Sequence, residues 1–161
     1  MNWQEVCLSP SLRNLPFKIE LNEWGKIVMS PASNRHGILQ AAIVRALTRA
    51  REEGVVISEC SILTARSVKV ADVAWASAEF MESQGEASPY LKAPELCIEI
   101  LSPSNTANEM EEKRELYFAK GALEVWLCDE QGTLAFYGCD GRLDGSRLFP
   151  GVTRIVTKYL H

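Results

Sequence analysis

The chain has 161 residues, of which 47% are hydrophobic and 24% are charged, a composition typical of one globular domain. Its net charge of −4 argues against a protein that coats nucleic acid non-specifically, because such binding depends on neutralising phosphates. The longest apolar runs fall short of the roughly 20 residues that span a bilayer, and MNWQEVCLSP lacks the features of a signal peptide. We expect a single domain over residues 1–161, no membrane partner and a cytoplasmic location.

The first predicted elements are a hairpin and a helix. Residues 17–29, FKIELNEWGKIVM, form two short strand-like runs around the turn signal Asn-Glu-Trp-Gly. SPASN then provides a cap for a helix in RHGILQAAIVRALTRAREEG, where apolar residues recur at helical spacing until Gly54. His36 and Gln40 lie on the same stripe as the apolar residues, so they extend the buried face toward the start of the helix.

Strands dominate the middle of the chain. Residues 55–59 and 68–75 have the apolar composition of strands, whereas residues 77–92 contain a glycine and a proline that suit a loop or an irregular helix. PELCIEIL then predicts a strand that ends at Ser102-Pro103.

A second helix and more strands complete the chain. Thr106 and Glu109 form a possible capping box for a helix that runs to Lys120 and stops at Gly121. Further strands are expected at residues 124–129, 133–138 and 151–160, the first two joined as a hairpin. This order of elements predicts an α/β fold of mixed α+β type, with a mixed sheet flanked by helices.

Two carboxylates stand in strands that are otherwise apolar. Asp72 lies within VADVAW and Glu99 within CIEIL. A buried carboxylate must be neutral, paired or bound to a cation, because an isolated buried charge costs several kcal/mol. If the two strands are neighbours, the two side chains could converge on a magnesium ion, which usually takes one or two carboxylates. The alternative is that each faces solvent from a half-exposed strand.

Cations and a histidine occur on the apolar faces of the helices. On a helical wheel Lys113 and Arg114 both fall within the apolar arc of the second helix. Each side chain could extend its aliphatic part along the apolar surface so that the charged end reaches water, or it could point at a buried anion. His36 could be a satisfied core residue, or it could orient a water or contact a phosphate.

The cysteines do not indicate a metal or redox motif. Cys7, Cys60, Cys97, Cys128 and Cys139 are scattered, with no CxxC pair. Buried free thiols are the expected interpretation. No cysteine has an evident base partner in the sequence, so a cysteine hydrolase is disfavoured.

Three segments together resemble the Uma family of putative restriction endonucleases, within the PD-(D/E)xK nuclease superfamily. They are IELNEWGKIVMSPASNRHG, VADVAW and PELCIEILSPSNTANEMEEKRELYFAKGALEVWLCD, and they cover about residues 15–140. The resemblance implies a restriction endonuclease-like core with metal ligands on adjacent strands. Two positions depart from the family pattern, since Ala71 stands where a proline is usual and Glu95 where an aspartate is usual.

The resemblance also assigns roles to residues. Asp72 and Glu99, with the main-chain carbonyl of Ile100, match the ligands of one or two magnesium ions, for which manganese could substitute. The superfamily lysine would stand at Leu101, so the matching lysine is Lys113 of the next helix. His36 matches a family position on the first helix.

The resulting hypothesis is a magnesium-dependent endonuclease that hydrolyses DNA phosphodiester bonds, most simply as a homodimer. Its catalytic residues would be Asp72, Glu99, Lys113 and His36, and Gln40 and Arg114 would contact the substrate. Additional candidates are two acids and five arginines: Glu20, Glu23, Arg35, Arg45, Arg49, Arg51 and Arg66. The rival hypothesis is a catalytically silent nuclease fold that acts in nucleic-acid or protein binding.

Overall fold

The computed structural model describes residues 1–159. The helical elements are α1 (Trp3–Leu8), the 3-10 turn η1 (Pro10–Leu12), α2 (Asn34–Ala50), α3 (Ala78–Gln84) and α4 (Ala107–Ala119). The strands are β1 (Phe17–Leu21), β2 (Ile27–Pro31), β3 (Val55–Thr64), β4 (Ser67–Ala76), β5 (Leu96–Ile100), β6 (Glu124–Cys128), β7 (Leu134–Gly138) and β8 (Gly141–Leu143).

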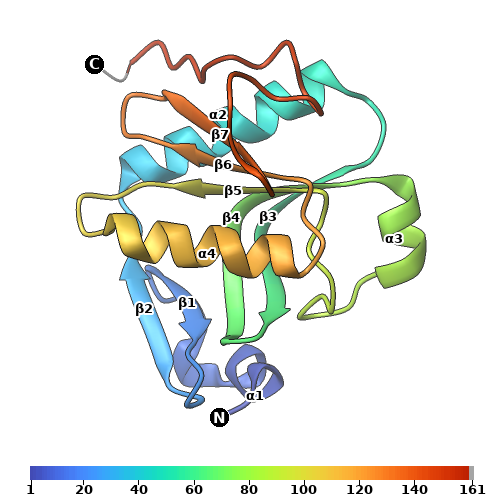
Figure 1. Cartoon of the computed structure of the whole chain (residues 1–161). Helices are drawn as coiled ribbons and strands as arrows, with labels where there is room; N and C mark the ends of the chain where they lie inside the picture. Colours follow the sequence, from blue (N-terminus) through green and yellow to red (C-terminus); the bar gives the residue numbers. More distant parts are fainter. Residues whose placement is uncertain (160–161) are drawn as a thin grey trace.

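Six strands form one mixed sheet in the order β3-β4-β5-β6-β7-β8. Only β5 and β6 pair in parallel, and α4 makes the crossover that a parallel pair requires. The other neighbours are antiparallel. β1 and β2 form a separate two-stranded hairpin, which lies below α4 and beside β4 in Figure 1. The expected mixed sheet with flanking helices is confirmed.

Helices cover both faces of the large sheet (Figure 1). On one face α2 packs Leu39, Ile43 and Leu47 against a core that includes Trp126 and Phe149. The other face carries α3 and α4, whose apolar side chains pack over the central strands. Burial of these aromatic and aliphatic side chains supplies the main stabilising free energy.

The ends of α2 and α4 follow the local sequence signals. Ser33 caps α2 by accepting a hydrogen bond from the amide of His36. Thr106 and Glu109 form the expected capping box of α4, so this helix starts directly after the SPSN turn. Gly121 follows the helix with φ of 103°, a conformation that a glycine adopts without strain.

Several expected features differ from the structure. Residues 151–159 form no strand and only an isolated bridge between Thr133 and Arg154, and residue 160 lies outside the described residues. These residues pack Val152 and Ile155 on the core face of α2, so their apolar pattern reflects burial of a coil. The strand expected at 55–59 continues to Thr64 and is paired with β4 at every position except Glu59.

Other differences concern the helices and cysteines. Residues 78–84 form α3, the helix alternative for that region, whereas the N-terminal helix α1 was not expected. Cys60, Cys97 and Cys128 are buried free thiols as expected, but Cys7 and Cys139 are exposed. None of the helices within residues 1–159 is long and apolar enough to cross a membrane.

Candidate active site

Asp72 and Glu99 lie side by side at the centre of the large sheet. β4 and β5 are antiparallel neighbours with Val73 opposite Ile98, so the next position in this register places Asp72 opposite Glu99. Both side chains are buried, with 1% and 3% of their surface exposed. The sheet therefore brings together two carboxylates that are 27 residues apart in the sequence.

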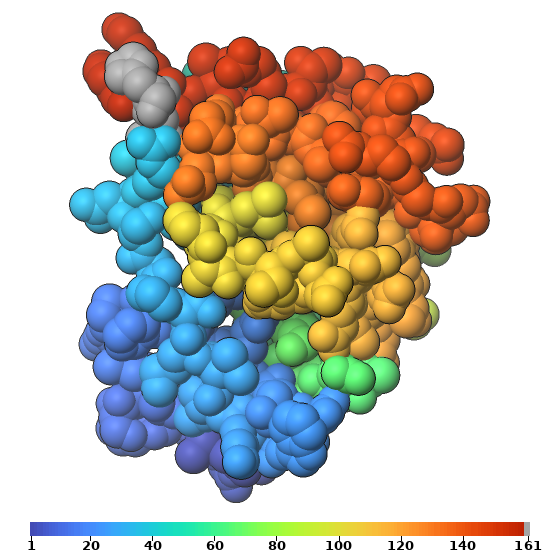
Figure 2. Space-filling view, turned by 60° about the vertical axis from the view of Figure 1, so that its left-hand side comes forward, coloured from blue at the N-terminus to red at the C-terminus, as the bar shows by residue number. Residues whose placement is uncertain are grey.

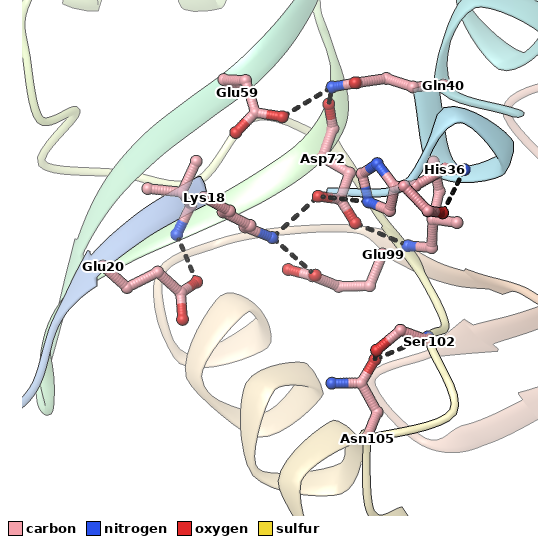
Figure 3. Close-up of polar contacts among 12 residues, drawn as sticks. Lys18, Glu20, His36, Gln40, Glu59, Asp72, Glu99, Ser102 and Asn105 are labelled. Atoms are coloured by element: carbon pink, nitrogen blue, oxygen red, sulfur yellow. Dashed lines mark hydrogen bonds and ion pairs between the residues drawn. The ribbon is translucent and has the colours of Figure 1, made fainter. Parts of the chain in front are cut away.

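The ammonium of Lys18 joins these two carboxylates. Its Nζ lies 2.9 Å from Oδ1 of Asp72 and 3.1 Å from Oε2 of Glu99. Figure 3 shows Lys18 entering from β1 and pointing between the two acids. Two buried anions thus share one cation from the small hairpin, which offsets their mutual repulsion.

A second ion pair lies next to the first. Lys113 of α4 places Nζ 2.9 Å from Oε1 of Glu20 and 3.3 Å from Oε2 of Glu99. Glu20 also accepts a hydrogen bond of 2.9 Å from the amide of Val70. Because alternate residues of a strand share a face, β1 directs both Lys18 and Glu20 into the cluster.

The remaining oxygens of the two acids are held by the protein. Oδ2 of Asp72 accepts a hydrogen bond of 2.7 Å from the amide of Ile100. Oε1 of Glu99 accepts one of 2.6 Å from the hydroxyl of Tyr117 on α4. Each carboxylate therefore has one oxygen fixed by the scaffold and one on the Lys18 ammonium.

α2 supports the cluster from the opposite side to α4. Nε2 of His36 lies 3.3 Å from Oδ1 of Asp72. The side-chain amide of Gln40 donates to the main-chain oxygen of Asp72 at 2.7 Å and to Oε1 of Glu59 at 2.8 Å. Glu59 has a positive φ of 54°, an uncommon conformation for a residue with a side chain. Gln40 thus links α2 to Glu59 of β3 and to Asp72 of β4 (Figure 3).

The surroundings shift the pKa values of the two acids in opposite directions. Burial acts to raise the pKa of Asp72, but the Lys18 charge and the hydrogen bond with His36 hold it well below its usual range. Burial raises the pKa of Glu99 above its usual range despite the charges of Lys113 and Lys18. Two titratable groups with pKa values moved apart are typical of catalytic sites.

The same contacts shift the pKa values of the two lysines and of His36. Burial acts to lower the pKa of Lys18, but the carboxylates of Glu99 and Asp72 raise it above its ordinary value. The pKa of Lys113 is also raised, because Glu99 and Glu20 outweigh its burial. The hydrogen bond to Asp72 raises the pKa of His36. Both ammonium groups are therefore charged at neutral pH.

A cavity of about 300 Å³ opens onto the cluster. Its wall comes from the small hairpin, α2, the turn after β5 and the start of α4, and includes Lys18, His36, Glu99, Asn105 and Lys113. Figure 2 shows the blue hairpin and the yellow turn before α4 facing each other across a hollow. The cavity thus reaches the buried acids from one side of the molecule.

The structure brings together most of the residues expected from the sequence. Asp72, Glu99, Lys113, His36 and Gln40 all line this cavity, and Ile100 lines it beside them. Arg114 is not among them. Its guanidinium stacks on the ring of Tyr137, with 3.8 Å from Cζ to the ring centroid, so the side chain serves the packing of α4 on β7.

Two residues in the cluster were missed in the sequence, Lys18 and Tyr117. Glu20 was a secondary candidate, and the period of two along β1 points from Glu20 to Lys18. Tyr117 follows Lys113 by four residues, the spacing that puts two side chains on one helix face. Tyr117 matches the pattern of an ordinary core residue, so only its contact with Glu99 distinguishes it.

The donor set suits a hard divalent cation. Oδ1 of Asp72 and Oε2 of Glu99 already converge on one positive charge, and carboxylate oxygens are the ligands that magnesium prefers. Within the described residues, no group of three or more His, Cys, Asp and Glu side chains is arranged to hold a metal ion. A cation here would rest on two carboxylates, completed by main-chain oxygen, water or substrate.

Comparisons with known proteins agree with this fold. The model of a family named Uma2, described as a putative restriction endonuclease, matches residues 3–145. A crystal structure described as a putative nuclease belonging to DUF820, from Anabaena variabilis, superposes with a TM-score of 0.69 at 19% identity. The match covers 96% of this chain and 93% of that one, and at this identity it shows a shared fold. No curated protein gives a significant match.

Proposed function

The chain belongs to the Uma2 family of putative restriction endonucleases, and from this membership we propose that it is a metal-dependent endonuclease that hydrolyses phosphodiester bonds of DNA. The observation that carries the proposal is the convergence of Asp72 and Glu99 on one cation, with Lys113 beside them. Paired carboxylates and a lysine at an open cavity suit phosphodiester hydrolysis, where charge develops on the phosphate oxygens.

Asp72 and Glu99, with the main-chain carbonyl of Ile100, would hold the magnesium ion. When bound, magnesium supplies a Lewis acid for the phosphate and lowers the pKa of a coordinated water. Manganese would substitute for it.

The side chains around the acids have distinct roles in this proposal. Lys113 positions the attacking water or stabilises negative charge on the phosphate, since its ammonium is buried and held beside Glu99. His36 faces the cavity next to Asp72, where it contacts water or phosphate. Gln40 holds the main chain of Asp72 and so fixes the position of that carboxylate.

A metal-binding titration tests the site. Isothermal titration calorimetry with Mn²⁺ should show one binding event for the parent protein and at least about tenfold weaker binding for Asp72→Ala and Glu99→Ala. Glu111→Gln, an exposed carboxylate on α4, is the control and should bind like the parent. Equal binding by all four proteins would show that the site assignment is wrong.

A cleavage assay tests the activity. Plasmid and single-stranded DNA incubated with the parent protein and Mn²⁺ should be cut, and Glu99→Gln should cut at least about 100-fold more slowly. Metal binding without cleavage of either DNA would instead support the silent binding module. Cutting both strands at one position would be simplest for a homodimer, because each chain carries one such cluster, and light scattering would measure the oligomeric state.

A further inference from the structure

The ammonium of Lys18 occupies the middle of the cluster. It contacts Oδ1 of Asp72 and Oε2 of Glu99, whereas the other oxygens of these acids are engaged by Ile100 and Tyr117. The two oxygens free of scaffold amides and hydroxyls are therefore the ones on Lys18. A metal ion that uses both carboxylates would need the same oxygens.

The balance of charge also indicates that a metal ion would compete with the Lys18 ammonium. Three buried carboxylates, Asp72, Glu99 and Glu20, lie against two ammonium groups, Lys18 and Lys113. A divalent ion added to this set would leave one excess positive charge beside Lys18. With the neighbouring His36 neutral, the charges would balance if the ion took the place of the Lys18 ammonium. Like charges that share two oxygens repel strongly.

We propose that Lys18 is a positioning residue that keeps Asp72 and Glu99 converged and that a divalent metal ion replaces on the two carboxylates. This inference rests on the proposed metal-dependent function. It adds that the Lys18 ammonium holds the two carboxylates until the metal ion takes its place.

The fold allows this exchange. Lys18 belongs to a hairpin that is separate from the six-stranded sheet, and its side chain lines the 300 Å³ cavity, so the long stem has space into which to move. Lys113 also contacts Oε2 of Glu99, at 3.3 Å, but its shorter ion pair of 2.9 Å is with Glu20, a carboxylate that the proposed metal ion does not use. The metal ion is therefore expected to release Lys18 and to leave Lys113 in place.

The first test uses the unaltered protein. Amine acetylation by an N-hydroxysuccinimide ester, followed by peptide mass spectrometry, compares the labelling of Lys18 in EDTA and in saturating Mg²⁺. We expect at least about fivefold more labelling of Lys18 in Mg²⁺, because its buried ion pairs are lost, and little change at Lys113. Equal protection of Lys18 in both conditions would overturn the proposal.

The second test compares Lys18→Met with Lys26→Met, a control on the same hairpin whose side chain is exposed. Without metal, Lys18→Met should melt at a lower temperature than the parent, because Asp72 and Glu99 then repel each other. In calorimetry it should bind Mn²⁺ at least about tenfold more tightly, since no ammonium competes. A merely structural lysine would give unchanged or weaker metal binding.

The outcomes distinguish the cation exchange at Lys18 from the metal-dependent function itself. If the parent binds Mn²⁺ but Lys18→Met binds with unchanged or lower affinity, the exchange is wrong and the metal-dependent function stands. If calorimetry detects no metal binding by either protein, the proposed metal site is wrong, and the exchange is wrong with it. The labelling experiment decides the exchange even if Lys18→Met does not fold.

Discussion

The hydroxyl of Tyr117 donates a hydrogen bond of 2.6 Å to Oε1 of Glu99, and both side chains are almost completely buried. Tyr117 stands one turn after Lys113, which contacts the other oxygen of the same carboxylate. α4 thus holds Glu99 through two side chains on one face, a neutral donor and a charged one. The helix that connects β5 to β6 therefore also orients the acid on β5.

Tyr117→Phe tests whether this hydrogen bond positions Glu99. Removing the hydroxyl leaves a buried carboxylate oxygen without its donor, so the free energy of unfolding should fall by about 1–3 kcal/mol in EDTA. Metal affinity measured by calorimetry should also fall. Tyr90→Phe is the matched control, because it removes the hydrogen bond to the oxygen of Gly85 and should cost stability without changing metal affinity.

Lys113→Met separates catalysis from general charge effects. Cleavage of plasmid DNA should fall by at least about 100-fold, because the developing charge on the phosphate loses a fixed cation of the site. Stability should fall by about 3–5 kcal/mol, since Glu20 and Glu99 remain buried with fewer partners. Lys92→Met, at an exposed position, should resemble the parent in both measurements. Equal cutting by all three proteins would remove Lys113 from the mechanism.

Glu20→Gln gives a prediction for the pH dependence of stability. Burial acts to raise the pKa of Glu20, but Lys113 and Lys18 outweigh it, so the folded value lies below the ordinary 4.5. A carboxylate with a lowered folded pKa contributes stability above its unfolded pKa and loses it as the pH falls through the folded value. Urea unfolding in EDTA should therefore show the parent more stable than Glu20→Gln near pH 6. The difference should shrink as the pH falls below about 4.5. A difference that stays constant to pH 3 would contradict the charge-pair account.

Glu124 provides a buried carboxylate that is structural. It accepts hydrogen bonds from Nε1 of Trp126 at 2.9 Å, from Oγ of Ser146 at 2.7 Å and from the amides of Arg147 at 2.7 Å and Leu148 at 3.0 Å. Glu124→Ala should lower the free energy of unfolding by about 3 kcal/mol or more, because several buried donors lose their acceptor. Its affinity for Mn²⁺, measured at low temperature where the variant is folded, should equal that of the parent. Loss of metal binding would place the metal elsewhere than on Asp72 and Glu99.

Glu99 and Glu124 show that one sequence pattern, an acid in an apolar strand, can correspond to two different structural environments. Both are carboxylates in apolar strands of the same sheet, and both are buried. Glu99 meets two lysines and an open cavity, whereas Glu124 meets neutral donors that anchor the C-terminal segment. Residue type and neighbours in the sequence do not separate these two environments, because the partners come from distant elements.

The sequence by itself determined the order of most elements, the caps of α2 and α4 and the acids in the central strands. These depend on periodicity and on signals a few residues long, such as Thr106 with Glu109. Only the tertiary structure decided that Lys18, which is 54 residues from Asp72 and 81 from Glu99, lies between them. It also decided that Arg114 packs on Tyr137 and that the last described residues form a coil. The physical reason is that ion pairs and core contacts depend on how the hairpin, helices and sheet pack together, which no local period of the sequence encodes.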